Sequence, residues 1–247
     1  MKNIPLNERL IFALDVDSMD TAKEWVDRLG SDIGFYKVGL QLFLAAGFPI
    51  VDWIVKRGHK VMLDLKLFDI PETVALAMKQ LRGRGATFVT VHGNDPILEA
   101  AVAAKGGTKV LSVTVLTSFG REDMIDIFGQ EADIEQLVLN RARKALRLNC
   151  DGVVSSGLEA KRLRSELGDN LLIVTPGIRP GVNRDVIKDD QKRIVTAMEA
   201  IQNGADYIVV GRPISTAKDP LAVVRSIHSE VSKALQSASN IPPSRLF

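Results

Sequence analysis

The sequence contains very little cysteine: a single residue, Cys150, among 247. One cysteine cannot form an intramolecular disulfide, so nothing in the sequence indicates an oxidising compartment. No neighbouring motif supplies a partner that would stabilise a thiolate, and the preceding run 146–149 is typical of a helix end. We therefore interpret Cys150 as an ordinary packing residue rather than a reactive thiol.

The sequence also lacks long apolar runs and an excess of one charge, and these two absences exclude classes of partner. No apolar run approaches the roughly 20 residues needed to span a bilayer, and residues 1–9 lack the apolar stretch of a signal peptide. An excess of one charge is also missing, because 32 Lys and Arg stand against 30 Asp and Glu, a formal net charge of +2. This balance gives no global reason to expect nucleic acid or an anionic membrane as a partner. We expect a cytoplasmic protein that holds any anionic ligand by local arrangement.

The sequence does contain a regular alternation of two kinds of segment. Eight short apolar, β-branched runs recur along the chain, with amphipathic stretches between them. Near-continuous apolar character is typical of parallel strands that are covered on both faces. The predicted strands are residues 10–16, 35–40, 60–67, 88–92, 110–116, 152–155, 171–176 and 207–211. The predicted helices between them include residues 19–29, 71–82, 134–148 and 191–203.

Eight strand–helix units without a break in composition favour one closed (β/α)₈ barrel, a TIM barrel that occupies residues 1–247 as a single domain. The length of 247 residues agrees with the ~250 residues of a typical barrel. An open, doubly wound sheet is the alternative that the pattern leaves open. Residues 237–247 are small, polar and rich in proline, and we expect a mobile tail there.

Polar residues collect where the predicted strands end, which is the face where barrel active sites lie. The end of a strand is wetter than its middle, and this explains some of the polar residues. It does not explain Asp64 and Lys66, which interrupt an otherwise apolar third strand. Period-two alternation sends the neighbouring leucines toward the helices and these two charges into the barrel. The residues at the predicted mouth are Asp15, Lys37, Asp64, Lys66, His92, Thr117, Ser118, Arg179, Gly211 and Arg212.

Charges inside a barrel need partners, because an unpaired buried charge costs several kcal/mol. Asp64 and Lys66 are each other's nearest candidates, with Lys37 and Asp69 close by. Carboxylates on either side would keep Lys66 protonated, and a protonated lysine in a dry cavity is a potential proton donor. The alternative is a structural cluster of ion pairs that plugs the barrel mouth.

A second group of residues is typical of a phosphate site. Residues 175–181 end the seventh strand with two glycines and Arg179, and Gly211, Arg212 and Pro213 end the eighth. Barrels often bind phosphate with the loops after these two strands, where glycine admits the anion to backbone N–H groups and arginine adds bidentate charge. The polar segment 180–190 predicts a lid over the ligand.

These motifs together resemble the orotidine 5'-phosphate decarboxylase family. Residues 64–73, Asp-Leu-Lys-Leu-Phe-Asp-Ile-Pro-Glu-Thr, are similar to its Asp-x-Lys-x-x-Asp signature. Segments 13–15, 36–39, 114–118, 175–180 and 210–213 match in the expected order, so that the resemblance covers about residues 10–232. Phe68 and Glu72 depart from the family, where His and Asn are common, but neither carries a central charge.

The resemblance implies an enzyme that converts orotidine 5'-phosphate to uridine 5'-phosphate in pyrimidine synthesis, as a homodimer and without cofactor or metal. Lys66 would protonate C6 of the pyrimidine, with Asp64 and Lys37 in its charged network. Asp69 would reach across the dimer into the partner's site. The implied substrate-binding residues are Asp15 and Lys37 for the ribose, Thr117 and Ser118 for the pyrimidine, Arg179, Gln191, Gly211 and Arg212 for the phosphate, and additionally Thr73 and Pro180.

Three other functions are compatible with a barrel. A metal-dependent phosphosugar decarboxylase would share the Asp-x-Lys-x-x-Asp element, but not its Ile-Pro continuation or the long segment after the seventh strand. A barrel that only binds nucleotides would keep the phosphate site and has no need of an interior lysine. An unrelated barrel isomerase or aldolase that forms a Schiff base requires a neutral amine, which the carboxylates around Lys66 disfavour.

Overall fold

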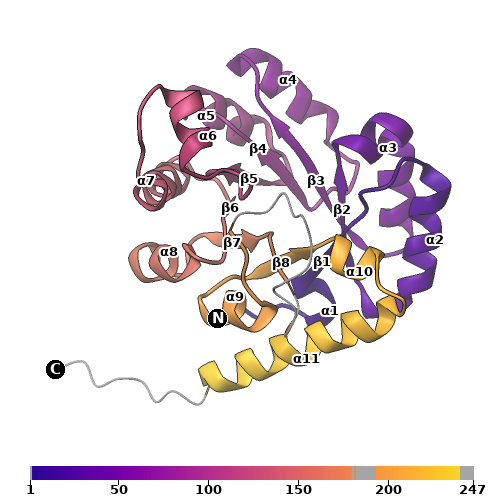
Figure 1. Cartoon of the computed structure of the whole chain (residues 1–247). Helices are drawn as coiled ribbons and strands as arrows, with labels where there is room; N and C mark the ends of the chain where they lie inside the picture. The colour runs from indigo at the N-terminus through magenta and orange to yellow at the C-terminus, as the bar shows by residue number, and fades with distance from the viewer. Residues whose placement is uncertain (1, 180, 182–192, 240–247) are drawn as a thin grey trace.

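The computed structural model describes residues 2–179, 181 and 193–239, and there eight parallel strands close into a barrel in chain order (Figure 1). Each strand overlaps one of the eight runs predicted from the sequence. The closed barrel is therefore confirmed, and the open sheet is wrong. The strands are β1 Leu10–Ala13, β2 Phe35–Gly39, β3 Lys60–Leu67, β4 Phe88–Val91, β5 Lys109–Val113, β6 Gly152–Val154, β7 Leu172–Thr175 and β8 Tyr207–Val210.

Helices form a ring around this barrel, and several begin where the sequence supplies a cap. The Ser18 side chain accepts a hydrogen bond from the backbone N–H of Thr21 at the start of α2, and Pro71 is the first residue of α4. The helices are α1 Leu6–Arg9, α2 Met19–Leu29, α3 Leu40–Lys56, α4 Pro71–Gln80, α5 Asp95–Ala104, α6 Arg121–Phe128, α7 Ile134–Arg147, α8 Ala160–Leu167, α9 Ala197–Gln202, α10 Arg212–Ser215 and α11 Pro220–Ser239.

Several predicted boundaries differ from the structure, most of them at strand ends by one to three residues, such as β1, which ends at Ala13 and not at residue 16. The helix expected over residues 191–203 is α9, which is shorter because Thr196 and Glu199 form a capping box that starts it at Ala197. Residues 237–239, expected in a mobile tail, belong to α11. The rest of that tail, residues 240–247, and most of the predicted lid, residues 180 and 182–190, lie outside the described residues.

The barrel interior is filled by apolar side chains at the end where the strands begin. Phe35, Phe88 and Tyr207 start three different strands, and their ring centroids lie 5.1–5.8 Å apart. All three are at most 7% exposed. This aromatic cluster closes one end of the barrel, so a ligand can enter only from the other, where the strands end.

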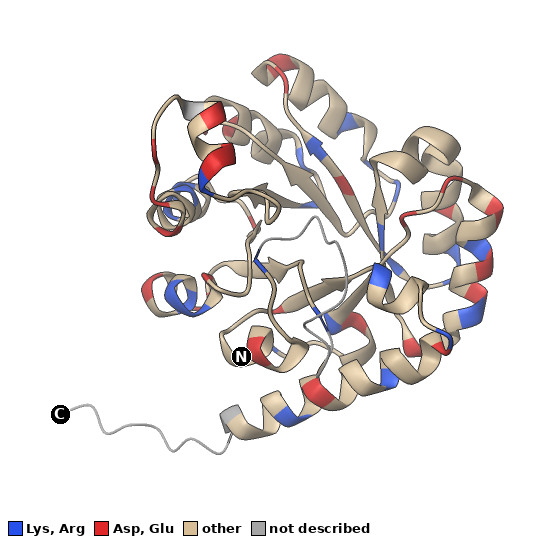
Figure 2. Ribbon diagram, in the orientation of Figure 1, with Lys and Arg blue, Asp and Glu red and all other residues tan. Residues whose placement is uncertain are grey.

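A second apolar layer lies between the strands and the surrounding helices, and includes Leu10, Phe12 and Leu63 of the strands. The outer faces of the helices carry charges of both signs, interspersed with one another (Figure 2). Burial of the strands on both faces explains their continuous apolar sequences. No helix within the described part of the chain is both long and apolar enough to cross a bilayer.

Candidate active site

A cavity of about 370 Å³ opens at the carboxyl ends of the strands. Among the described residues, its walls come from seven of the eight strands (all except β4) or the loops that follow them, and most of the polar strand ends that the sequence predicts lie here. The residues that line it are Ala13, Asp15, Lys37, Asp64, Lys66, Val113, Val115, Leu116, Thr117, Ser118, Val154, Pro176, Gly177, Arg179, Val209, Gly211 and Arg212.

Four charged side chains of alternating sign form a chain across one wall of this cavity. Lys37 Nζ lies 2.8 Å from an Asp15 carboxylate oxygen and 3.8 Å from Asp64 Oδ2. Lys66 Nζ donates to Asp64 Oδ1 at 3.0 Å. Asp64 thus lies between two ammonium groups. The predicted pairing of Asp64 with Lys66 and Lys37 is confirmed.

The backbone of β3 brings Lys66 beside Asp64 by a route that simple alternation does not predict. The register between β3 and β4 shifts between Leu63 and Leu67, and Lys66 adopts a left-handed conformation with φ of 47°. Such a conformation costs a non-glycine residue on the order of 1–3 kcal/mol. The Lys66 N–H donates to Thr90 Oγ1 at 2.9 Å, and the Thr90 hydroxyl donates to Asp64 Oδ1 at 2.9 Å. A single threonine therefore fixes both the bulge and the carboxylate.

The electrostatics of the wall favour an ionised Asp64. Burial alone would raise the pKa of this carboxyl group. The ammonium groups of Lys37 and Lys66, with the hydrogen bonds from Lys66 and Thr90, more than offset the burial and hold the pKa of Asp64 below its ordinary value. The cavity consequently contains a fixed carboxylate between two cations.

Two cavity residues at the ends of β7 and β8 supply positive charge, as the phosphate prediction requires. Arg212 is the first residue of α10, and Arg179 lies after β7, where its N–H donates to the carbonyl of Val195 at 2.9 Å. Gly211 permits close packing, since a Cβ there would lie 3.3 Å from the Cβ of Ala13. We call residues 176–179 the phosphate-side lip and residues 115–118, which include Thr117 and Ser118, the pyrimidine-side lip, after the parts of the ligand that the sequence analysis predicts there.

Other predicted residues lie away from this cavity. Asp69 and Thr73 are exposed and do not line it, and the Asp69 carboxylate accepts the N–H of Ile70 at 2.6 Å. His92 is also outside the lining and packs against Phe68, with ring centroids 5.4 Å apart. The predicted binding residues Pro180 and Gln191 lie outside the described residues.

Sequence reasoning missed Thr90. A threonine within the run Phe-Val-Thr-Val is an ordinary strand residue by composition, and only the fold brings it to Asp64, 26 positions away. As for metal ligands, the described part of the chain holds no group of three or more His, Cys, Asp and Glu side chains placed to bind an ion.

Comparison with known proteins agrees with this geometry. Residues 8–227 match the family model described as the orotidine 5'-phosphate decarboxylase / HUMPS family. A protein called orotidine 5'-phosphate decarboxylase from Methylococcus capsulatus is 52% identical over 231 residues, 93% of this chain and 94% of that protein. One of the same name from Rhodopseudomonas palustris is 46% identical over 229 residues, 92% of this chain and 96% of that protein.

Solved structures give the same result. The crystal structure of orotidine 5'-phosphate decarboxylase from Lactobacillus acidophilus superposes with a TM-score of 0.78 at 35% sequence identity, and the match covers 91% of this chain and 99% of that one. The family match spans all eight strands, and the matches to single relatives and to the solved structure cover 91–93% of this chain. The chain therefore belongs to the orotidine 5'-phosphate decarboxylase / HUMPS family.

Proposed function

We propose that this chain decarboxylates orotidine 5'-phosphate to uridine 5'-phosphate and carbon dioxide. The observation that carries the proposal is the ammonium group of Lys66, held 3.0 Å from the carboxylate of Asp64 at the wall of the cavity. The names of the relatives support the same reaction, since they are called orotidine 5'-phosphate decarboxylase and match 92–93% of this chain.

The reaction breaks the bond between C6 of the pyrimidine and its carboxylate. Carbon dioxide leaves, and the electron pair stays on C6 as a carbanion that the ring stabilises poorly. An enzyme accelerates this step only by favouring the transition state over the bound substrate. In the proposed mechanism the Lys66 ammonium stabilises the developing charge and transfers a proton to C6, then regains a proton from solvent. No step of this mechanism uses a metal or an organic cofactor.

Asp64 has two roles in this mechanism. Its carboxylate holds Lys66 in position through their hydrogen bond, while Thr90 fixes the carboxylate in turn. Its ionised form, which the lowered pKa favours, would also repel the carboxylate of the substrate until carbon dioxide departs. A residue that must stay charged in a largely buried site is well served by two neighbouring ammonium groups.

The remaining cavity residues fit the other parts of the nucleotide. Asp15 and Lys37, joined by a 2.8 Å ion pair, would bind the ribose hydroxyl groups. Thr117 and Ser118 on the pyrimidine-side lip would contact the base. Arg179, Gly211 and Arg212 would bind the 5'-phosphate, for which arginine offers bidentate geometry. Thr73, Pro180 and Gln191 remain predicted contributors to substrate binding.

We further propose that the enzyme is a homodimer in which Asp69 completes the partner's site. Asp69 is exposed, and the residues on either side of it, Phe68 and Ile70, are 68% and 65% exposed, so that two large apolar side chains flank it at the surface. A second copy of the chain would cover them. Mixed Asp69→Ala and Lys66→Ala subunits should then regain activity, because each hybrid has one intact site. Heterodimers without activity would contradict the shared site.

A place in pyrimidine synthesis and a cytoplasmic location are part of the same proposal. The near-balanced net charge of +2 supports a small-molecule ligand rather than nucleic acid. The thiol of Cys150 is buried, and burial raises its pKa to about 12, so that it stays protonated and unreactive. This agrees with a chain that makes no use of disulfide chemistry.

The test of the proposed function is an ultraviolet assay of purified protein with orotidine 5'-phosphate after treatment with a chelator. We expect uridine 5'-phosphate to form at an undiminished rate. Activity that chelation abolishes and a divalent metal restores would favour a metal-dependent phosphosugar decarboxylase. Tight binding of uridine 5'-phosphate without any turnover would favour a nucleotide-binding barrel.

A further inference from the structure

A buried ion pair lies next to the cavity, and neither partner lines it. Arg193 Nη1 donates to Glu159 Oε1 at 2.6 Å, and the two side chains are only 10% and 7% exposed. Glu159 immediately precedes α8. A buried ion pair is weak evidence for stability in itself, because the desolvation of both charges opposes their attraction. The other contacts of the guanidinium group therefore decide what the pair does.

The guanidinium of Arg193 also holds the pyrimidine-side lip. Its Nη2 donates to the carbonyl oxygens of Val115 at 3.1 Å and Leu116 at 2.9 Å. These two carbonyls directly precede Thr117 and Ser118, which line the cavity. Because the guanidinium is a rigid planar fork, its bond to Glu159 sets the direction in which Nη2 points. The ion pair thus fixes the position of this lip.

The backbone of the same segment holds the phosphate-side lip. The N–H of Val195 donates to the carbonyl of Gly177 at 3.3 Å, and the carbonyl of Val195 accepts the N–H of Arg179 at 2.9 Å. Gly177 and Arg179 both line the cavity. The three residues 193–195 are therefore bonded to both lips, one through a side chain and the other through the main chain.

We propose that Arg193, oriented by Glu159, is a positioning residue that joins the pyrimidine-side lip to the phosphate-side lip, so that binding at one lip sets the geometry of the other. This inference rests on the proposed function, which assigns the two lips to the two ends of the nucleotide. Binding energy from a remote phosphate can assist chemistry at the base only when the two parts of the site are connected. Arg193 supplies such a connection, and it acts through Thr117, Ser118 and Arg179 rather than on the substrate.

The experiment compares Arg193→Met with Arg164→Met in the full-length protein. Arg164 is a matched control, because its side chain is 19% exposed and pairs with a buried aspartate, Asp206, close to where the strands begin. We measure kcat/KM for orotidine 5'-phosphate, the affinity for uridine 5'-phosphate and thermal unfolding, with kinetics at a temperature where each variant is fully folded. Arg193→Met should lower kcat/KM about 100-fold, as expected for small misplacements of reacting groups, and should also weaken nucleotide binding.

Arg164→Met should lower the melting temperature and leave kcat/KM per folded molecule unchanged. Arg193→Lys should recover part of the loss, because an ammonium keeps the charge without the planar fork. Equal kcat/KM for Arg193→Met and wild type would overturn the proposal. Turnover by the wild-type chain in the same assay separates that result from a failure of the proposed function.

If Arg193→Met does not fold, a second variant tests the positioning role of Arg193. Glu159→Gln keeps the shape of the partner and removes its charge, so that the bond from the guanidinium weakens and the direction of the guanidinium is held less firmly. We expect kcat/KM to fall about tenfold, the equivalent of weakening one such hydrogen bond. A wild-type value in a folded Glu159→Gln protein would overturn the proposal.

Discussion

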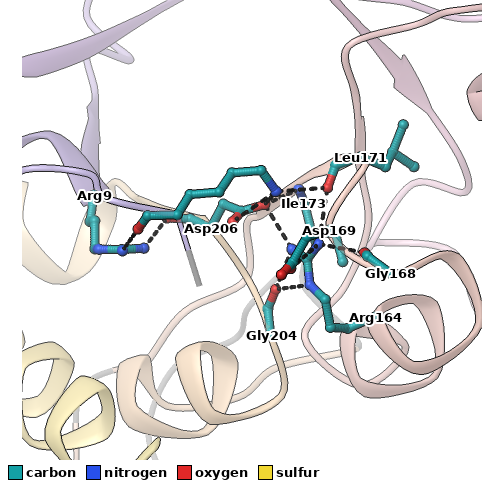
Figure 3. Close-up of polar contacts among 9 residues, drawn as sticks. Arg9, Arg164, Gly168, Asp169, Leu171, Ile173, Gly204 and Asp206 are labelled. Carbon is teal, nitrogen blue, oxygen red and sulfur yellow. Dashed lines mark hydrogen bonds and ion pairs between the residues drawn. The ribbon is translucent and has the colours of Figure 1, made fainter. Parts of the chain in front are cut away.

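The barrel has a cluster of charges near each end, and the two are built differently. Near the start of the strands, the carboxylate of Asp206 accepts hydrogen bonds from Lys2, from Arg164 at 2.7 Å and from the N–H of Ile173 at 2.9 Å (Figure 3). The cations of this cluster also donate to main-chain carbonyls, including those of Leu171 and Gly204. Fixed main-chain atoms therefore take up much of the donor capacity at this end.

The cluster at the cavity, with Asp15, Lys37, Asp64 and Lys66, has a different set of partners. Each lysine ammonium has three donors. Within the described part of the chain, the hydrogen bonds and ion pairs of these two ammonium groups go to the carboxylates of Asp15 and Asp64 alone. These two ammonium groups therefore keep N–H donors at the cavity surface that can bind a ligand. Charges fixed by main-chain atoms stabilise the fold, whereas ammonium groups paired only with carboxylates keep donors that can serve chemistry.

Among the substitutions that test this comparison, the loss of Lys66 should have the largest effect. Lys66→Ala removes both the proton donor and the cation beside C6, so turnover should fall by at least about 10⁴-fold, the combined size of general-acid and electrostatic contributions. Binding of uridine 5'-phosphate should be largely retained, because the phosphate-side residues are untouched. Steady-state kinetics and calorimetric titration measure the two quantities.

Lys60→Ala is the matched control, since Lys60 begins the same strand and pairs with Glu8 at 2.5 Å, far along β3 from the cavity. We expect near-normal turnover from it. If Lys66→Ala kept more than a tenth of the wild-type rate, the proton would have to come from another group, and the division between the two clusters would lose its main support.

The next effect should appear in stability and not in catalysis. Asp206→Asn leaves Arg164 and Lys2 without their buried counter-charge, and breaking a buried ion pair costs about 3–5 kcal/mol. The free energy of unfolding, from denaturant titration, should fall by this amount while kcat/KM stays unchanged. Asp169→Asn is the control, because Asp169 pairs with the same Arg164 but is 65% exposed. It should cost less than about 1 kcal/mol.

A reduced kcat/KM in folded Asp206→Asn protein would show that the distant cluster also influences the cavity. An equal loss of stability in Asp206→Asn and Asp169→Asn would show that burial does not determine how much each ion pair contributes to the free energy of unfolding. Either result would remove the distinction between a structural and a functional cluster.

The sequence predicts the cluster at the cavity better than the one near the strand starts. Asp64 and Lys66 lie two positions apart in an apolar strand, so a local pattern reveals them. Asp206 meets Lys2, a residue 204 positions away, and Glu159 meets Arg193 at a separation of 34. No periodic pattern links residues at such distances, because only the folded barrel brings them together.

The local geometry of β3 could also be predicted only in part from periodicity. Alternation correctly indicated that Asp64 and Lys66 face the interior. It did not predict the register shift or the left-handed backbone of Lys66, because both depend on Thr90 of the neighbouring strand. The strands, the helices and the end of the barrel where the cavity opens could be predicted from the hydrophobic pattern and the helix caps. The bulge that aims the proton donor follows from a cross-strand contact that becomes visible only when β3 lies beside β4.

The smallest expected effect is a pH dependence of stability that arises from the cavity cluster. The pKa of Asp64 is lower in the folded protein than its ordinary value, because Lys37, Lys66 and Thr90 together outweigh the effect of burial. A carboxyl group of this kind contributes stability that is present above its unfolded pKa of about 4 and is lost as the pH falls through its folded pKa. The free energy of unfolding should therefore decrease below about pH 4 more steeply for the wild type than for Asp64→Asn.

Thr90→Val sharpens this last measurement, since valine keeps the shape of threonine and removes the hydroxyl that donates to Asp64. The pKa of Asp64 should rise in this variant without returning to its ordinary value, because both ammonium groups remain. The loss of stability that Asp64 causes on acidification should still begin near its unfolded pKa of about 4, but it should be smaller than in the wild type and end at a higher pH, and Asp64→Asn should lack this contribution. Parallel curves for all three proteins would mean that the lysines, despite their short distances to Asp64, do not hold it ionised, and a mechanism that needs a charged Asp64 would lose its electrostatic basis.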